Sequence, residues 1–201
     1  MKNDVARDIS YATSANGLMG QLFIRSIENI TGRIGLIKRA KDYDIEVAKG
    51  RNFWEVIVER YNIKMNLIKG SFEDIPKKGP VVIVSNHPFA ILDGLLLGYI
   101  LSKTRNDFKI IDNRVFRKAK DLDEVVLPIS FEENREGNLQ NINTRNEAIR
   151  FLKGGGIVGI FPGGTVATSA KLFSRPLDPF WKRFTYKHIM KSGATVVPNF
   201  F

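Results

Sequence analysis

The sequence predicts an α/β fold in which helices wrap a central, mostly parallel sheet and also form a helical N-terminal extension. Two observations predict this class. Short apolar runs rich in β-branched residues recur from residue 81 onward, and segments with helical periodicity separate them. Strands that alternate with helices build parallel sheets, because the chain must cross back before each new strand begins. The 201 residues, 43% of them hydrophobic, suit one such domain with a sizeable core.

A basic amphipathic helix is predicted near the N-terminus. From Leu18 to about Lys41 the apolar residues recur at steps of three and four. Two interpretations stay open: the helix lies on an anionic membrane surface, or it packs on the core and leaves a basic face in water. Gly32 and Gly35 weaken the helix locally. The cations beside the apolar positions are Arg25, Arg33, Lys38, Arg39 and Lys41.

The remaining elements follow in chain order. A second helix is predicted over Phe53 to Tyr61, and a half-exposed strand where Ile63, Met65 and Leu67 alternate with polar residues. Buried strands are then predicted at 81–84, 108–111, 125–129, 157–161 and 195–197, with helices at 91–101, 144–153 and 179–191. The chain thus divides into a helical extension, residues 1–62, which is a candidate for membrane-surface binding, and a core, residues 63–201.

Charge and composition limit the classes of partner. The net charge of +10 favours an anionic partner, which is nucleic acid, an anionic membrane or a phosphorylated substrate. No zinc-finger spacing and no aromatic-plus-basic RNA-binding motif occurs, so we expect no nucleic-acid partner. The chain has no cysteine, which excludes disulfides and thiolate chemistry, and no cluster with metal-ligand spacing, so we expect no metal. No segment of about 18 consecutive lipid-compatible residues is present.

Two loops that directly follow predicted strands carry the candidate chemistry. The first, 85–94, contains His87 and Asp93, and the second, 161–169, contains Gly163, Gly164 and Thr165. Sites of parallel sheets form in loops at the carboxyl ends of strands. Histidine is a base near neutral pH, and a carboxylate can fix its tautomer. The plainer alternatives are a loop histidine with a helix-start carboxylate, and a simple strand-to-helix turn.

These blocks resemble the glycerolipid and lysophospholipid acyltransferase superfamily. Asn86-His87 followed by Asp93, then Phe161-Pro162-x-Gly164-Thr165, then Val197-Pro198 come in the family's order and with family-like spacing. The resemblance covers roughly residue 63 to the C-terminus. The three blocks together are fairly specific, whereas one block alone would be weak.

The sequence departs from the usual family pattern in its spacing and in its second loop. Five residues separate His87 from Asp93 where the family usually has four. Gly163 stands where a glutamate is usual, and Val166 where an arginine is frequent. In its looser spacing and its small residue at position 163, the sequence resembles a bacterial branch of the superfamily that includes lyso-ornithine lipid acyltransferases. These departures make it less certain that this chain shares the usual glycerol-3-phosphate-type acceptor specificity of the family. They bear less on the prediction that His87 and Asp93 are the catalytic pair.

The resemblance implies an O-acyltransferase that moves a fatty-acyl group from a thioester to a hydroxyl of a lysolipid. The acceptor would be lysophosphatidic acid or a lyso-aminolipid, and the donor acyl-CoA or acyl carrier protein, with no further cofactor. His87 would be the general base and Asp93 its partner, at a peripheral site on the cytoplasmic face of the inner membrane. The implied substrate-binding residues are Asn86, Gly163, Gly164 and Thr165.

Three arginines between the blocks are further candidates for substrate binding. Arg114, Arg135 and Arg145 could bind a phosphate or carboxylate, although surface arginines are commonly only solvated. Two other functions remain open: a non-catalytic lipid-surface protein on the same scaffold and, more weakly, nucleic-acid binding through the basic face. Because family members commonly continue beyond the Val197-Pro198 block, we expect the core to be truncated at its C-terminus.

Overall fold

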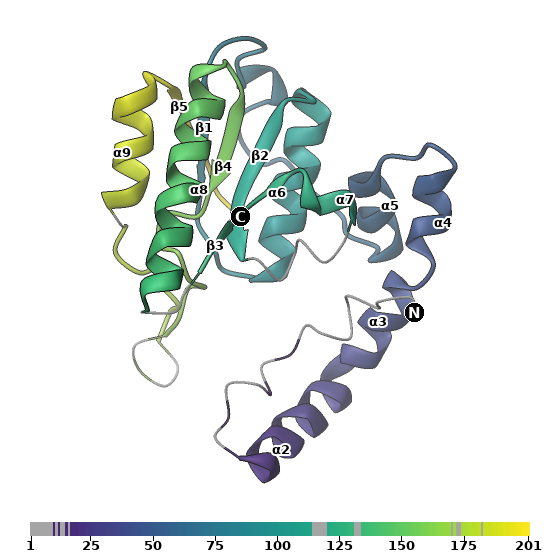
Figure 1. The fold of residues 1–201 in the computed structure, drawn as a ribbon. Helices are drawn as coiled ribbons and strands as arrows, with labels where there is room; N and C mark the ends of the chain where they lie inside the picture. The colour runs from purple at the N-terminus through teal and green to yellow at the C-terminus, as the bar shows by residue number, and fades with distance from the viewer. Residues whose placement is uncertain are drawn as a thin grey trace. The chain divides into compact units, whose positions relative to one another are not determined.

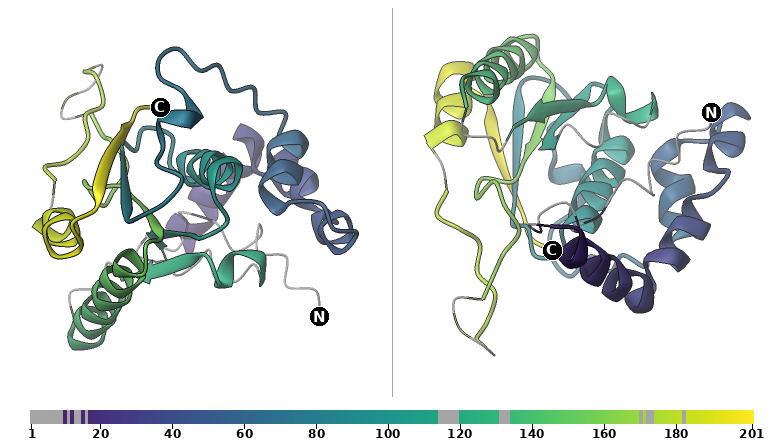
Figure 2. Two further views of the ribbon diagram at one scale, coloured as in Figure 1. Left: turned by 90° about the horizontal axis from the view of Figure 1, so that it is seen from above. Right: turned by 60° about the horizontal axis from the view of Figure 1, so that its bottom comes forward.

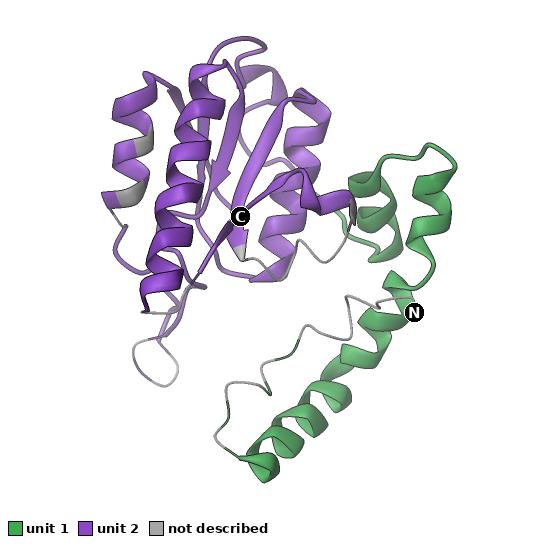
Figure 3. Ribbon diagram, viewed as in Figure 1, with its two compact units in different colours: residues 1–65 green, residues 66–201 purple. Residues whose placement is uncertain are grey.

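A computed structural model describes residues 10, 12, 15, 17–113, 120–130, 134–169, 171, 174–181 and 183–201. They fall into two compact units, residues 1–65 and residues 66–201 (Figure 3). The second unit carries the sheet and every described residue of the two candidate loops.

Five parallel strands form the sheet (Figure 1). They are β1 Val81–Ser85, β2 Phe108–Asn113, β3 Val126–Ile129, β4 Ile157–Ile160 and β5 Thr195–Asn199. Their order across the sheet is β3-β2-β4-β1-β5. The predicted α/β fold with a parallel sheet is confirmed, and all the carboxyl ends of the strands meet at one edge.

Helices cover both faces of this sheet (Figure 2). The long ones are α6 Ile91–Thr104, α8 Arg135–Lys153 and α9 Arg183–Ser192, and the short ones are η3 Phe72–Asp74 and α7 Lys120–Asp123. Helix α6 packs closely on one face, because a Cβ added at Gly159 of β4 would lie 2.9 Å from the side chain of Leu97. The neighbouring residues Val158 and Ile160 point to the opposite face, which α8 and α9 cover.

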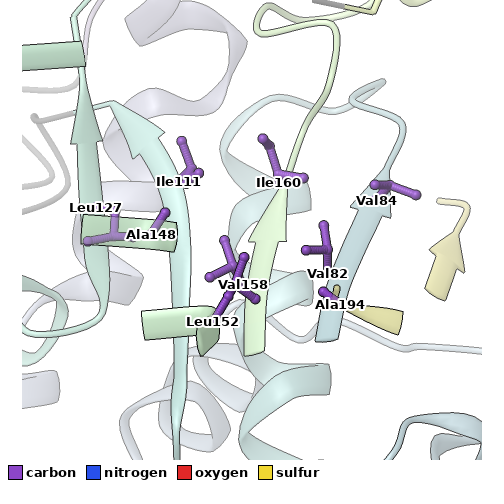
Figure 4. Close-up of a cluster of buried hydrophobic side chains, with 9 residues drawn as sticks. All are labelled: Val82, Val84, Ile111, Leu127, Ala148, Leu152, Val158, Ile160 and Ala194. Carbon is purple, nitrogen blue, oxygen red and sulfur yellow. The ribbon is translucent and has the colours of Figure 1, made fainter. Parts of the chain in front are cut away.

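A hydrophobic cluster fills the space between the sheet and α8 and α9 (Figure 4). It contains Val82, Val84, Ile111, Leu127, Ala148, Leu152, Val158, Ile160 and Ala194. Because both faces of the sheet are covered, every residue of β1 is buried, which explains its uninterrupted apolar sequence. The strands are therefore a rigid support for the loops at their ends.

The first unit is helical, as predicted. Its elements are α2 Leu18–Glu28, the π-helical turn η2 Asn29–Arg33, α3 Ile34–Ala40, α4 Tyr43–Ala48 and α5 Phe53–Arg60. The predicted long helix is interrupted at Gly32, whose φ of 114° belongs to the region that favours glycine. Arg60 and Arg51 both contact the carboxylate of Glu46, and these pairs join α5 and the turn before it to α4.

Three sequence predictions about element boundaries are wrong. No strand forms at 63–67, where Met65 and Leu67 are 37% and 53% exposed; the stretch has no strand partner among the described residues. Helix α8 begins at Arg135 rather than at Thr144, because the side chain of Asn134 accepts a hydrogen bond from the N–H of Gly137 and caps a polar first half. Helix α9 begins at Arg183 rather than at residue 179.

Candidate active site

The two candidate loops lie side by side at the carboxyl edge of the sheet. They follow β1 and β4, which are hydrogen-bonded neighbours. The chain leaves β1 over one face, through α6, toward β2, and it leaves β4 over the other face, through α9, toward β5. In open α/β sheets, ligands usually bind at the carboxyl edge, between the loops of adjacent strands whose connections pass over opposite faces.

A buried carboxylate holds the imidazole in the first loop. The Nδ1 atom of His87 lies 2.9 Å from Oδ2 of Asp93, and the N–H of Phe89 donates to the same oxygen at 2.8 Å. Asp93 is fully buried, and its Oδ1 has no hydrogen-bond partner in the described part of the chain. An ionised Asp93 favours the tautomer with the proton on Nδ1, which leaves the lone pair on Nε2 for an external group.

A strained turn accommodates the five residues between His87 and Asp93. Ala90 has φ 56° and ψ −119°, in a region that residues with a side chain seldom adopt. The N–H of Leu92 donates to the carbonyl of Phe89 across this turn at 3.3 Å. The turn ends where α6 begins, so that Asp93, in the first turn of the helix, points back toward His87.

Residues from outside the loop hold the ring and the backbone of His87. The ring of Phe161, at the end of β4, stacks on the imidazole with centroids 4.2 Å apart and planes 19° apart. The carbonyl of His87 accepts a hydrogen bond from the N–H of Ala167 at 2.8 Å, and its N–H donates to Oδ1 of Asp178 at 3.1 Å. The imidazole is thus held by Asp93 at Nδ1 and by Phe161 on one ring face, and the backbone of His87 is held at both its N–H and its carbonyl, while the side chain stays 14% exposed.

The glycines of the second loop have different roles. Gly164 has a φ of 77° and donates its N–H to the carbonyl of Phe161 at 2.9 Å, so its amide closes the turn. Gly163 is buried against Pro179: an added Cβ would lie 3.0 Å from Cδ of that proline. Thr165 is exposed. The N–H groups of Gly163 and Thr165 have no hydrogen-bond partner among the residues that the structure describes.

Asn86 joins the first loop to the end of β5. Its carboxamide accepts a hydrogen bond from the N–H of Phe201 at 2.8 Å and donates to the carbonyl of the same residue at 3.2 Å. Next to it, the amide of Asn199 donates to the hydroxyl of Ser85 at 3.1 Å. These contacts give Asn86 a part in positioning the loop; its predicted contact with substrate stays a prediction.

The structure describes two of the three candidate arginines and does not bring those two together. Arg114 lies outside the described residues. Arg135 is exposed at the first position of α8, and Arg145 is half-buried ten residues further along the same helix, which separates them by about 15 Å. Their substrate-binding roles stay predictions.

Sequence reasoning missed Asp178 and Pro179 as parts of this site. It placed Phe161 in the second loop but did not predict that its ring stacks on the imidazole. The sequence predicts that the segment Leu177-Asp178-Pro179 leads into a helix over 179–191. The segment instead forms a bridge to Thr168, with hydrogen bonds of 3.1 and 3.2 Å. An isolated carboxylate between prolines was the one signal in the sequence, and no local pattern connects it to a histidine 91 residues away.

Comparisons with known proteins identify the family. The model of the acyltransferase family matches residues 68–200, about two thirds of the chain. The chain therefore belongs to the acyltransferase family, and the predicted membership of the glycerolipid acyltransferase superfamily is confirmed. No solved structure matches it.

Curated relatives add detail. A lyso-glycine lipid O-acyltransferase of Phocaeicola vulgatus is 29% identical over 153 residues, which are 76% of this chain and 52% of that protein. A second lyso-glycine lipid O-acyltransferase, from Bacteroides thetaiotaomicron, is 27% identical over 153 residues, again 76% of this chain and 53% of its own length. The chain thus spans about half the length of the curated relatives it matches.

Proposed function

We propose that this protein is a lipid O-acyltransferase that moves a fatty-acyl group from a thioester to a hydroxyl of a lysolipid, with His87 as the general base. One observation carries the proposal: a fully buried Asp93 lies 2.9 Å from Nδ1 of His87, beside the Gly163 loop, in a chain of the acyltransferase family. The arrangement matches the chemistry, because acyl transfer to an alcohol needs a base near the attacking oxygen.

The reaction needs no nucleophile from the protein. Nε2 of His87 accepts the proton of the acceptor hydroxyl while the hydroxyl oxygen attacks the thioester carbonyl. The imidazolium that forms is stabilised by the carboxylate of Asp93. The tetrahedral intermediate then collapses, the C–S bond breaks, and the proton passes from Nε2 to the leaving sulfur. The products are the acyl ester and the free thiol.

The second loop supplies candidates for stabilising the oxyanion. Among its amides, that of Gly164 is engaged within the turn, whereas those of Gly163 and Thr165 are unengaged in the described part of the chain. Backbone N–H groups held rigidly in a buried loop are effective donors to a developing negative charge. We assign the N–H of Gly163 this role, with Thr165 beside it.

A lyso-aminolipid is the acceptor that the similarities favour. The curated relatives are described as lyso-glycine lipid O-acyltransferases. The residue that differs most from the usual family loop, Gly163, has Pro179 packed where a longer side chain would extend. The donor is acyl-CoA or acyl carrier protein; both are anionic and suit the net charge of +10.

We further propose peripheral binding at the cytoplasmic face of the inner membrane through the first unit. Along α2, η2 and α3, large apolar side chains are exposed: Leu18, Met19, Leu22, Phe23, Ile27, Ile30, Ile34 and Leu36. Arg25 and Arg33 beside them lie 3.9 and 3.7 Å from the carboxylate of Glu28, so Lys38 is better placed to meet anionic headgroups. No helix in the described residues is long and apolar enough to span a bilayer.

Acyl transfer by the full-length protein tests the proposal. Acyl-CoA and acyl carrier protein are each offered with lyso-glycine lipid, lyso-ornithine lipid or lysophosphatidic acid in detergent. We expect thiol release that depends on a lyso-aminolipid, together with the diacyl product in the mass spectrum. Binding to anionic vesicles without any thiol release would instead favour the alternative of a non-catalytic lipid-surface protein, which needs the exposed face of α2 but not His87.

A further inference from the structure

Exposed large apolar side chains gather around the candidate active site. We define the site rim as Phe89, Leu177, Phe180, Trp181 and Phe200, which are 59%, 72%, 100%, 57% and 80% exposed. They come from three separate segments of the second unit. Surface apolar residues are common singly, but several large ones around one candidate site mark a surface that meets an apolar partner.

The backbone under the site rim is fixed by the site itself. Leu177 and Phe180 flank Asp178 and Pro179, which contact the N–H of His87 and the backbone of Gly163. Phe89 donates its own N–H to Asp93, and Phe200 precedes a residue that pairs with Asn86. The side chains are therefore held outward at the carboxyl edge, within two residues of groups that contact the two loops.

The charges beside the site rim are almost all positive. Between residues 171 and 191 the sequence has a single carboxylate, Asp178, and this one accepts the N–H of His87. Lys171, Arg175 and Arg183 are exposed in the same stretch and form no ion pair within the described residues. Phenylalanine and tryptophan next to unpaired cations suit the boundary between anionic headgroups and acyl chains.

We propose that the site rim is a membrane-contacting surface, distinct from α2 and α3, that docks the active-site edge onto an anionic bilayer. The inference rests on the proposed function, because docking of this edge lets a lysolipid reach His87 without leaving the interface. A protein is the other partner that exposed aromatic side chains and arginine could meet, although protein interfaces are depleted of lysine. The surplus of cations and the full exposure of Phe180 favour the bilayer.

Quenching of Trp181 fluorescence tests this docking in the full-length protein. The vesicles contain phosphatidylcholine alone or with phosphatidylglycerol, and their acyl chains are brominated near the headgroup. We expect quenching with the anionic vesicles. The quenched component should vanish in Trp181→Phe, which keeps an apolar ring at the rim. Leu177→Ser combined with Phe180→Ser should weaken partitioning by about tenfold or more.

A matched control distinguishes binding through the site rim from non-specific hydrophobic binding to vesicles. Met190 is 63% exposed on the last turns of α9, near the start of β5 and hence at the opposite edge of the sheet, so Met190→Ser should leave partitioning unchanged. The rim variant should also lose turnover of a vesicle-embedded acceptor but retain turnover of a detergent-dispersed one.

Distinct results overturn the two proposals. If the fluorescence of Trp181 stays unquenched while acyl transfer proceeds, the proposal that the site rim contacts the membrane is overturned. A concentration-dependent dimer that shields Trp181 without vesicles would overturn it as well, since the occupant would then be a second copy. The proposed function itself would be overturned by a different result. That result is the absence of acyl transfer to any acceptor in detergent, whether or not the fluorescence of Trp181 is quenched.

Discussion

At the scale of single residues, the candidate chemistry depends on how Asp93 is confined. Its Oδ2 accepts hydrogen bonds from a ring and from a backbone amide, and its Oδ1 is buried without a partner among the described residues. Burying a carboxylate with half of its acceptors unused is unfavourable unless a positive charge develops beside it. In the proposed reaction the imidazolium of His87 would be such a charge, which gives the placement a functional reason.

Ala90→Gly should raise stability and lower turnover. Ala90 has a φ of 56°, and a residue with a side chain held there costs of order 1–3 kcal/mol, which glycine relieves. We expect a melting temperature higher by about 2–4 °C, measured by thermal unfolding. Turnover should fall because a looser turn confines Asp93 less. Ala40→Gly, at the end of α3, is the control and should not stabilise; an unchanged or lower melting temperature for Ala90→Gly would refute the strain.

At the scale of elements, the segment Leu177-Asp178-Pro179 joins the two loops of the site. Asp178 accepts the N–H of His87, and Pro179 covers Gly163. A glutamate at position 163, which is usual in the family, would bring its Cβ to 3.0 Å from Cδ of this proline, so the proline would have to shift. The departure at Gly163 is therefore coupled to the packing of a neighbouring segment.

A double-mutant cycle between Gly163 and Pro179 measures this coupling. A Cβ at position 163 would lie 3.0 Å from Cδ and 3.3 Å from the carbonyl oxygen of Pro179, so Gly163→Ala should destabilise by about 1–2 kcal/mol. In the Pro179→Ala background Cδ is gone and the penalty should shrink by at least about 0.5 kcal/mol. Gly35→Ala, with open space around it, is the control. Strictly additive penalties would mean that the proline does not pack on Gly163.

Arg105 ties three loops together at the amino edge of the sheet, away from the site. Its guanidinium donates to the carbonyl of Gly79 at 2.9 Å and also contacts the carbonyl of Gly155 and the carboxylate of Asp107. Lysine cannot serve these partners at once, so Arg105→Lys should destabilise by about 1–3 kcal/mol and leave turnover unchanged. Arg175→Lys, at an exposed position, is the control for urea unfolding.

The pH dependence of that destabilisation follows from Asp107. The hydrogen bond from Arg105 lowers the pKa of Asp107, so this contribution is present above the ordinary carboxyl pKa and is lost as pH falls through the lowered value. Once the pH lies below the lowered pKa of Asp107, the difference between wild type and Arg105→Lys should shrink but persist, since carbonyl oxygens do not titrate. A difference that disappears entirely would mean that the carbonyl contacts contribute nothing.

Most elements could be predicted from the sequence because their signals are local. The apolar run 81–84 and the apolar segment 91–101 lead directly to β1 and α6. Local signals failed where the structure of a segment depends on a partner distant in sequence. Residues 63–67 alternate as in a strand but have no strand to pair with among the described residues. The polar first half of α8 depends on a cap at Asn134 rather than on apolar periodicity.

At the scale of the whole molecule, topology assembles what sequence order separates. The loops with His87 and Gly163 could be predicted to share an edge, because both follow strands of a parallel sheet. The strand order that makes β1 and β4 neighbours could not be predicted, and neither could the return of residue 178 to His87. Long-range pairing depends on how the complete sheet packs, and no short motif encodes it.

The central claim is that His87 is the base of a lipid acyl transfer, and one paired measurement tests it most directly. Thiol release from acyl-CoA in the presence of a lyso-aminolipid is measured for the full-length wild type, His87→Ala and Asp93→Asn, with vesicle co-sedimentation measured on the same samples. Loss of a positioned base should lower turnover by about 10²–10⁴-fold, and Asp93→Asn should act in the same direction because its amide favours the wrong tautomer. Vesicle binding should stay unchanged. Wild-type turnover in His87→Ala would contradict the account.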